Sequence, residues 1–132
     1  MQQREWLDLY LEGWRTGDAD LSLSATAPAF FYDDPDTGRI RRDGFRRFFE
    51  KFRAAGAEMA GGKVPVPFLQ YSDLTVVDTN PAVAPAIAWC WWRVTGTEFR
   101  GAACIRFDQT GVLNERIAYF TDNPNETAIP AE

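Results

Sequence analysis

Two residues in this chain could share acid–base chemistry. Tyr10 lies in an amphipathic segment near the N-terminus, and Asp34 directly precedes Pro35. Because the chain contains no histidine, proton transfer must use carboxylates or tyrosine hydroxyls. An aspartate can remove a proton next to a carbonyl while a hydroxyl donates to the oxygen where charge develops. The pair therefore predicts a site for enolisation, in which an apolar pocket would raise the pKa of Asp34 by desolvation.

Both residues also have a structural interpretation. The segment Asp33-Asp34-Pro35 could begin a turn, since aspartate and proline are common there. Tyr10 lies on the inner face of its predicted helix and could be a core residue whose hydroxyl bonds within the protein. Trp14, one turn later on the same face, could close the base of a cavity. The residue pattern alone leaves these alternatives open.

Composition bounds the class of protein. The 132 residues are 45% hydrophobic and 14% aromatic, which predicts a single domain over 1–122, followed by a polar tail, 123–132, expected to be flexible. No apolar run approaches the roughly 20 residues that span a bilayer. A net charge of -5 opposes binding to nucleic acid or anionic membranes. We expect a small apolar ligand instead.

Cysteine usage indicates a reducing compartment. Cys90 and Cys104 sit in apolar, strand-like runs, and the N-terminus does not resemble a signal peptide. A cytoplasmic protein is expected. Without histidine, and with both cysteines isolated, the sequence predicts no zinc site, and we expect no cofactor.

Hydrophobic periodicity divides the chain into a helical first half and a strand-rich second half. Leu7, Tyr10, Leu11 and Trp14 recur at helical spacing, and Gly17-Asp18 ends that helix. The predicted helices are 3–16, 18–26 and 43–56. The predicted strands are 29–32, 63–70, 73–79, 85–96, 98–108 and 112–121. Helices followed by a run of strands predict an α+β fold, with a curled, mostly antiparallel sheet covered by helices on one face.

Strand alternation assigns side chains to faces of the sheet. In the strand around 86–95, Trp89 and Trp91 share one face and Trp92 lies on the other. Tryptophan on both faces predicts that the outer face is covered, most simply by a second copy of the chain, giving a homodimer. On the last strand, alternation groups Arg116, Ala118 and Phe120 against Glu115, Ile117 and Tyr119.

The order of elements, the Asp-Pro segment and the run Ala102 to Leu113 resemble the cone-shaped NTF2-like or SnoaL-like superfamily, over most of the chain. Steroid isomerases and polyketide cyclases belong to it. The isomerases place a helix-one tyrosine before a Gly-Asp at the spacing seen here between Tyr10 and Gly17, and their catalytic base directly precedes a proline. The resemblance implies a cone of three N-terminal helices on the sheet, with Asp34 as base and Tyr10 as donor.

The family register implies that Trp92 faces the cavity and that Trp89 and Trp91 face a dimer partner. It also implies a set of pocket residues. It turns Arg116 inward, where Arg116 could supply an oxyanion donor or pair with Asp34, although a position on the rim stays open. Ala103 stands where the isomerases carry a protonated aspartic acid, a residue that the ketosteroid isomerase mechanism requires as a donor. Ala118 stands where cyclases and epoxide hydrolases carry an aspartate. The expected substrate-binding set is Trp14, Tyr32, Phe49, Trp92, Ala103, Arg116, Ala118 and Phe120.

Three functions fit these observations. The first is a cofactor-independent isomerase or cyclase that acts on an apolar, enolisable ketone or polyketide-like compound. The second is a non-catalytic module for binding a hydrophobic ligand or for assembly, since Ala103 and Ala118 replace family acids. The third is a dehydratase or epoxide hydrolase in which Asp33 or Asp34 orients water.

Overall fold

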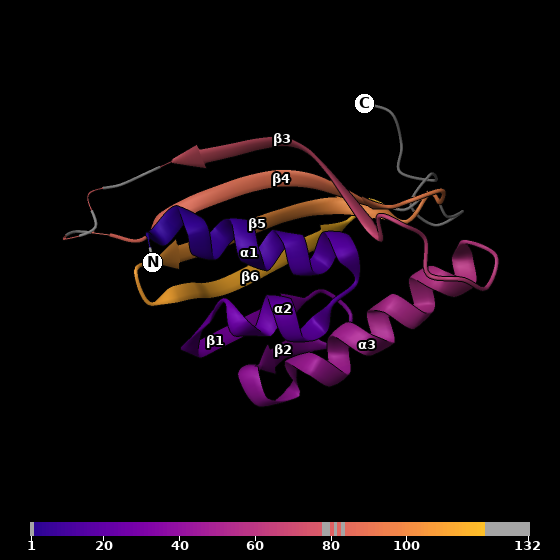
Figure 1. Cartoon of the computed structure of the whole chain (residues 1–132), viewed down its shortest axis with the longest axis horizontal. Helices are drawn as coiled ribbons and strands as arrows, with labels where there is room; N and C mark the ends of the chain where they lie inside the picture. Colours follow the sequence, from indigo (N-terminus) through magenta and orange to yellow (C-terminus); the bar gives the residue numbers. More distant parts are fainter. Residues whose placement is uncertain (1, 78–79, 81, 83, 121–132) are drawn as a thin grey trace, which may run out of the picture.

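A computed structural model describes residues 2–77, 80, 82 and 84–120 of the chain (Figure 1). Its element order confirms the predicted α+β class. The elements are α1 (Gln3–Thr16), α2 (Ala19–Ser24), β1 (Thr26–Asp34), β2 (Gly38–Arg41), α3 (Arg42–Met59), β3 (Leu69–Val77), β4 (Ala86–Val94), β5 (Arg100–Asp108) and β6 (Gly111–Tyr119). The predicted tail, 123–132, lies outside the described residues.

The strands form one sheet in the order β2-β1-β6-β5-β4-β3. Neighbours pair antiparallel except β1 and β6, which are parallel, so the mostly antiparallel prediction is confirmed. The parallel pair is made possible because the whole α3–β5 region intervenes between β1 and β6. Through this pairing the first strand and the last strand lie side by side inside the sheet.

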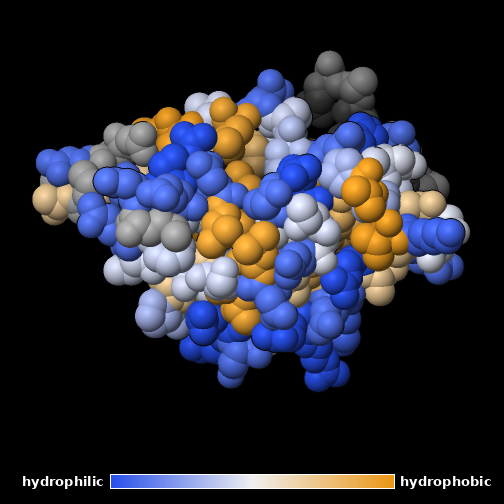
Figure 2. Space-filling view, in the orientation of Figure 1, coloured by the Kyte–Doolittle hydropathy of each residue, from blue (hydrophilic) through white to orange (hydrophobic). Residues whose placement is uncertain are grey.

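The helices lie on the concave face of the curled sheet. Helix α1 crosses this face and contacts β3, β5 and β6, whereas α3 contacts β1 and β2 (Figure 1). The side of the molecule seen in the same orientation is largely hydrophilic, with hydrophobic residues in separate patches (Figure 2). The apolar stripe of α1 is therefore turned into the cone, and this orientation brings Tyr10 and Trp14 to the inner face of the sheet.

Local signals explain why α1 begins and ends where the sequence predicts. The Glu5 side chain accepts a hydrogen bond from the backbone N–H of Gln2 at 2.9 Å, which caps the first turn. Gly17 ends the helix in the left-handed region at φ 74°, a conformation that costs glycine no steric penalty. Asp18 then caps α2 by accepting from the Leu21 N–H.

Two predicted regions differ from the structure. The turn-rich link after Asp34 contains strand β2, which forms a hairpin with β1 and pairs Asp34 with Gly38. The predicted strands 63–70 and 73–79 are replaced by the single strand β3, because Pro65 and Pro67 cannot donate to a ladder. The apparent break at Ser72-Asp73 is a bulge rather than a turn.

The interior is filled mainly by aromatic side chains. The Trp14 and Phe49 rings stack with centroids 3.9 Å apart, and Phe45 meets Phe30 edge to face at 5.0 Å. Such contacts add roughly 0.5–1.5 kcal/mol each beyond the burial of area.

Within the described residues, no helix is long and apolar enough to cross a membrane.

Candidate functional site

The centre of the cone holds a buried carboxyl group, Glu115 on β6, bonded to Tyr10 on α1. The Tyr10 hydroxyl donates to Glu115 Oε1 at 2.5 Å. Tyr10 is fully buried and Glu115 is 3% exposed. A carboxyl in such a place needs partners, because an isolated buried charge is costly. In the described part of the chain, the hydrogen bond from Tyr10 is the one side-chain bond to this carboxyl.

Burial sets the proton affinity of this carboxyl. Desolvation raises the pKa of Glu115 to about 8, against an opposing, smaller effect of the Tyr10 hydrogen bond, which favours the ionised form. The same burial, together with the negative charge of Glu115, raises the pKa of Tyr10 well above its usual value. Glu115 is thus the group that exchanges a proton near neutral pH, and Tyr10 stays a donor.

A β-bulge explains why Glu115 points inward. Arg106 pairs with Asn114 and Phe107 pairs with Val112, so Leu113 is an extra residue without a partner on β5. The pairing of β6 with β1 shifts at the same place. Val112 is fully buried, so strict alternation would turn the even-numbered residues after it inward. The extra residue switches the phase and turns Glu115 inward instead.

This phase change corrects the predicted orientation of three residues. Arg116, Ala118 and Phe120 do not face the interior. Arg116 lies on the outer face, where its Nε donates to Asp33 Oδ2 at 3.1 Å, so it does not pair with Asp34. Phe120 is 46% exposed, and Ala118 lines an outer-surface pocket beside it. The inward residues of the last strand are Glu115, Ile117 and Tyr119.

Asp34 is the last residue of β1, and three donors form hydrogen bonds to it. Its carboxylate accepts from Thr37 Oγ1 at 2.7 Å, from the Tyr119 hydroxyl at 2.8 Å and from the Asp36 N–H at 3.3 Å. Two of these donors belong to the β1–β2 turn, as the structural interpretation of the Asp-Pro segment predicts. Asp34 is only 6% exposed. The three bonds fix the β1–β2 turn to β6.

Asp34 and Tyr10 do not share a hydrogen bond, since each has its own partner on β6. Tyr10 donates to Glu115, and Asp34 accepts from Tyr119 four residues along the same strand. The buried Tyr32 pairs with Glu115 across β1 and β6 and stands two positions before Asp34; burial, and to a smaller extent the charges of both carboxyl groups, raise the pKa of its hydroxyl. The interior thus contains two separate carboxyl groups, each with its own hydrogen-bond partner. Asp34 and Tyr10 do not form the single site that the sequence predicted.

The other predicted pocket residues lie on the inner face or in the core. Trp92 faces inward on β4, its indole N–H donates to the Ala102 carbonyl at 3.1 Å, and its ring meets Tyr119 edge to face. Ala103 is buried on β5, opposite Ile117. Trp14, Tyr32 and Phe49 are buried in the aromatic core. Their roles in binding stay predictions.

Four buried polar side-chain atoms have no hydrogen-bond partner among the described residues, and two of them belong to aromatic residues that face the interior. These two are the hydroxyl oxygen of Tyr71, on β3, and the indole nitrogen of Trp14, on α1. The Trp14 N–H lies near enough to Tyr10 to lower the pKa of its hydroxyl as a donor. Buried polar groups are normally paired, so such exceptions mark places where a ligand or water completes the bonding.

The comparisons with known proteins concern the fold. No protein-family model matches the sequence, and no curated protein matches it significantly. Solved structures do match. A candidate polyketide cyclase of Xanthomonas campestris superposes with a TM-score of 0.58 at 16% identity, over 94% of this chain and 92% of that one. An NTF2-like protein of Anabaena variabilis gives 0.59 at 16%, over 90% and 87%. The chain has the NTF2-like fold.

A candidate ketosteroid isomerase of Kribbella flavida has the same NTF2-like fold, with a TM-score of 0.56 at 14% identity, over 98% of this chain and 88% of that one. At this level of identity, the likeness shows the fold and leaves chemistry to the residues. Within the NTF2-like cone of this chain, Ala103 supplies no acid, but the last strand does present an inward carboxyl, Glu115, three positions before Ala118.

The site residues that sequence reasoning missed are Glu115, Tyr119 and Tyr71. A signal for Glu115 existed in the alternation itself, since its set includes the apolar Ile117 and the aromatic Tyr119, whereas the other set begins with an arginine. In the described part of the chain, no group of three or more cysteine, aspartate or glutamate side chains could hold a metal ion. The arrangement can hold and transfer a proton in an apolar enclosure.

Proposed function

We propose that this protein is a cofactor-independent acid–base enzyme that acts on a small, apolar, enolisable ketone, with Glu115 as the proton carrier. One observation carries the proposal: a carboxyl group in an aromatic interior, bonded to the Tyr10 hydroxyl. A base with a pKa near the working pH is the most effective proton carrier, and a pKa of about 8 meets that condition. The NTF2-like fold, shared with candidate cyclases and isomerases, supports the same class of reaction.

The reaction needs a proton acceptor and a stabilised oxyanion. The Glu115 carboxylate would remove a proton from the carbon next to the carbonyl and form an O–H bond. The C–H electron pair then forms the C=C bond of the enolate, and the π pair of the carbonyl moves onto its oxygen. Once protonated, the Glu115 carboxyl can donate to the Tyr10 oxygen, which frees the Tyr10 proton for a developing oxyanion. Tyr10 therefore keeps its predicted role as a donor, and the proton carrier is Glu115.

Exchange of ketone protons in D2O tests this proposal without knowledge of the natural substrate. Acetophenone and 1-tetralone would be incubated with the protein, and loss of the α-proton signals would be followed by proton NMR. We expect catalysed exchange by the wild type and a loss of about 10²- to 10⁴-fold in Glu115→Gln, the usual range for general base catalysis. Exchange that is equal in both proteins would contradict the assignment.

A non-catalytic ligand-binding protein is the second candidate. It is favoured by the mutual bond of Tyr10 and Glu115 and by the aromatic packing of Trp14 on Phe49, which complete the interior without any reaction. In this case the same ketones would raise the melting temperature but show no exchange above the buffer rate. The NMR measurement thus separates the two functions.

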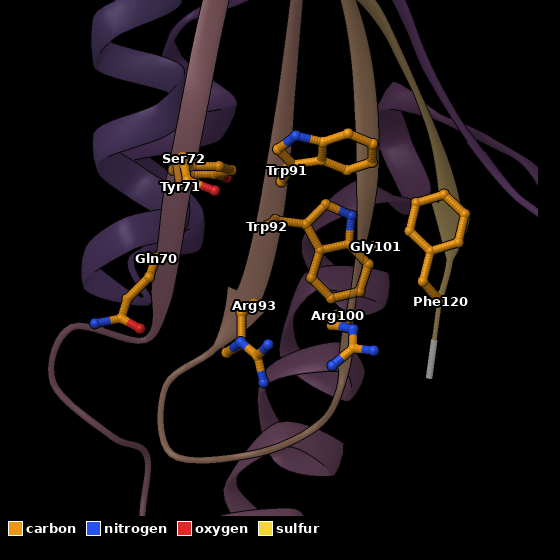
Figure 3. Close-up of a pocket in the computed structure, with 9 residues that line it drawn as sticks. All are labelled: Gln70, Tyr71, Ser72, Trp91, Trp92, Arg93, Arg100, Gly101 and Phe120. Carbon is orange, nitrogen blue, oxygen red and sulfur yellow. The ribbon is translucent and has the colours of Figure 1, made fainter. Parts of the chain in front are cut away.

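We also propose that the protein forms a homodimer through the outer face of the sheet. The helices cover the other face, which leaves Trp89 and Trp91 about half exposed at 53% and 50%. Between them and Phe120 runs an apolar pocket of about 490 Å³. An adjoining pocket of about 650 Å³, drawn in Figure 3, shares Trp91 and Phe120 and continues toward Arg93 and Arg100. A second copy on a two-fold axis would bury this face against itself.

A further inference from the structure

A cluster of positive side chains lies away from the interior of the cone, where β1, β2 and the start of α3 meet. Residues 39–51 carry six positive and two negative side chains, although the whole chain has a net charge of -5. Figure 2 shows a largely hydrophilic lower edge, where Figure 1 places β2 and the start of α3. A local positive field of this kind attracts anions even to an acidic protein.

The cluster lines a pocket of about 440 Å³. One wall is apolar and consists of residues 28–31. The other wall carries three arginines, Arg39, Arg41 and Arg42, together with the carboxylate of Asp43. The pocket thus combines apolar surface with an excess of positive charge.

An irregularity in β1 forms the apolar wall. Between the pairs Thr26–Val112 and Phe31–Asn114, β1 advances five residues while β6 advances only two. The extra residues of this bulge lie outside the regular ladder and include Pro28 and Ala29, both exposed. The bulge therefore presents apolar surface beside the arginines.

Two of the arginines are held in place by other groups of the protein. Arg39 Nε and Nη2 donate to Asp33 at 2.9 and 3.1 Å, and its guanidinium carbon lies 3.7 Å from the centroid of the Phe31 ring. Arg42 Nε donates to Thr26 Oγ1 at 2.9 Å, and its Nη2 donates to a carbonyl of α2 at 3.4 Å. These bonds use Nε and Nη2 of each arginine. In the described part of the chain, neither Nη1 group has a hydrogen-bond partner.

The arrangement leaves positive charge without a balancing carboxylate. Arg39 shares Asp33 with Arg116, whose Nε donates to it at 3.1 Å, so two guanidinium groups meet one carboxylate. The exposed side chain of Arg41 has neither a hydrogen bond nor an ion pair among the described residues. Because each arginine has five N–H donors, the pocket retains several that a ligand can use.

The pocket is separate from the two sites already proposed. Phe31 directly precedes the inward-facing Tyr32, so alternation turns Phe31 to the outer face. Strands β6 and β5 lie between β1 and the strand that carries Trp91. None of the residues that line the pocket belongs to the proton site at Glu115 or to the apolar face around Trp91.

We infer that this pocket binds a phosphate monoester that carries an aromatic or other apolar group. Phosphate offers three strong acceptor oxygens and nearly two negative charges above its second pKa of about 6, which suits a set of three guanidinium groups. The apolar wall at Pro28 and Ala29 is the contact surface for the group attached to the phosphate. This binding site goes beyond the proposed function and does not depend on it.

Titration with phenyl phosphate, followed by phosphorus NMR at about pH 8 and low ionic strength, tests the inference. We expect saturable binding that is tighter than the binding of inorganic phosphate, because the phenyl ring adds contacts with the apolar wall. Added sodium chloride should weaken binding, because salt screens exposed charges. Benzoate, which has the same ring but a carboxylate, should compete only weakly. Absence of saturable binding, or equal affinity for benzoate, would overturn the inference.

A pair of arginine variants separates a pocket from a diffuse positive surface. Arg41→Gln removes a side chain without a partner in the described structure, so the melting temperature should stay unchanged, whereas the dissociation constant of phenyl phosphate should rise about 10-fold or more. Arg47→Gln is the matched control, because Arg47 is an exposed arginine of α3 that does not line the pocket. It should leave the dissociation constant unchanged. Equal weakening by both variants would overturn the inference.

Two further variants test the sign of the charge effect and the independence of the site. Asp43→Asn removes the negative charge of the pocket wall and should strengthen the binding of phenyl phosphate several-fold. Weaker binding in this variant would contradict the assignment. Glu115→Gln should bind phenyl phosphate as the wild type does, whatever its effect on ketone exchange, because Glu115 does not line the pocket. The titration and the exchange measurement can therefore fail separately.

Discussion

The Tyr10 hydroxyl and the Glu115 carboxyl, 105 positions apart in the chain, form a hydrogen bond at the centre of the cone. The bond links the first helix to the last strand, and burial keeps the pKa of Glu115 raised although the bond favours the ionised form. Two properties follow from it. The chemistry of the site should depend on the ionisation of Glu115, and so should the stability of the fold.

Proton exchange should rise with pH until Glu115 is ionised. Because the base form carries the reaction, we expect the exchange rate of acetophenone to increase through pH 8 and then level off. Tyr10→Phe removes the hydrogen bond that favours the ionised form, so the midpoint should move to higher pH. A series of NMR exchange rates from pH 6 to 10 would measure both midpoints. A midpoint unchanged by Tyr10→Phe would show that the bond does not tune the base.

The same raised pKa predicts how stability depends on pH. The folded state holds the Glu115 proton up to about pH 8, whereas the unfolded chain releases it near the ordinary glutamate pKa of 4.5. The folded state therefore binds more protons between these values, and its free energy of unfolding should fall as pH rises from 4.5 to 8. Glu115→Gln should flatten this slope.

Several described groups have pKa values shifted away from that window. Burial raises the pKa of Tyr10, Tyr32 and Tyr71 well above 10, and that of Cys90 to about 12. Asp33 has a lowered pKa, because Arg39 bonds to it, so it acts only at lower pH. Urea unfolding of the wild type and Glu115→Gln at four pH values would measure the difference. Parallel slopes would mean that Glu115 is ionised in the folded protein throughout.

How much of this fold the sequence predicts depends on whether the signal is local. The helix α1 follows from its 3.6-residue apolar period and from Gly17, both of which lie within a few residues. Simple alternation in β4, which has no bulge, places Trp92 on the opposite face from Trp89 and Trp91, and the family register indicated which face is the inner one. Local rules also identified the Asp34 turn, although not the strand that follows it.

Non-local irregularities explain what the sequence could not predict. A single extra residue, Leu113, reverses the faces of β6 and moves Glu115 inside and Arg116 outside. Its position depends on pairing with β1 and β5 and not on local preference. The bonds from Tyr119 to Asp34 and from Tyr10 to Glu115 join elements far apart in the chain. The sequence around one residue of each pair therefore does not indicate its partner.

The role of Asp34 can be decided by two substitutions. Asp34→Ala deletes an acceptor for Thr37, Tyr119 and the turn backbone, so it should lower the free energy of unfolding by about 1–3 kcal/mol. Asp34→Asn keeps one acceptor oxygen and should be less destabilising, with ketone exchange retained. Denaturant unfolding and NMR exchange measure both effects. Loss of exchange in Asp34→Asn at unchanged stability would restore the sequence-based hypothesis that Asp34 is the base.

The outer sheet face gives the last prediction. Trp91 lies near the centre of the exposed apolar face and lines both of its pockets, so Trp91→Lys would place a charge at the middle of a dimer interface. Central tryptophans typically contribute about 2 kcal/mol or more, which corresponds to a dissociation constant raised roughly 30-fold. Sedimentation velocity over a range of concentrations would measure the shift.

Met59→Lys is the matched control for this experiment, because Met59 is similarly exposed, at 57%, but lies at the end of α3. It should leave association unchanged. Trp91→Lys should not alter proton exchange in the cone, because the Trp91 side chain lies on the opposite face from Glu115. A wild type that sediments as a monomer at all concentrations, or a dimer that survives Trp91→Lys, would mean that this face meets another partner.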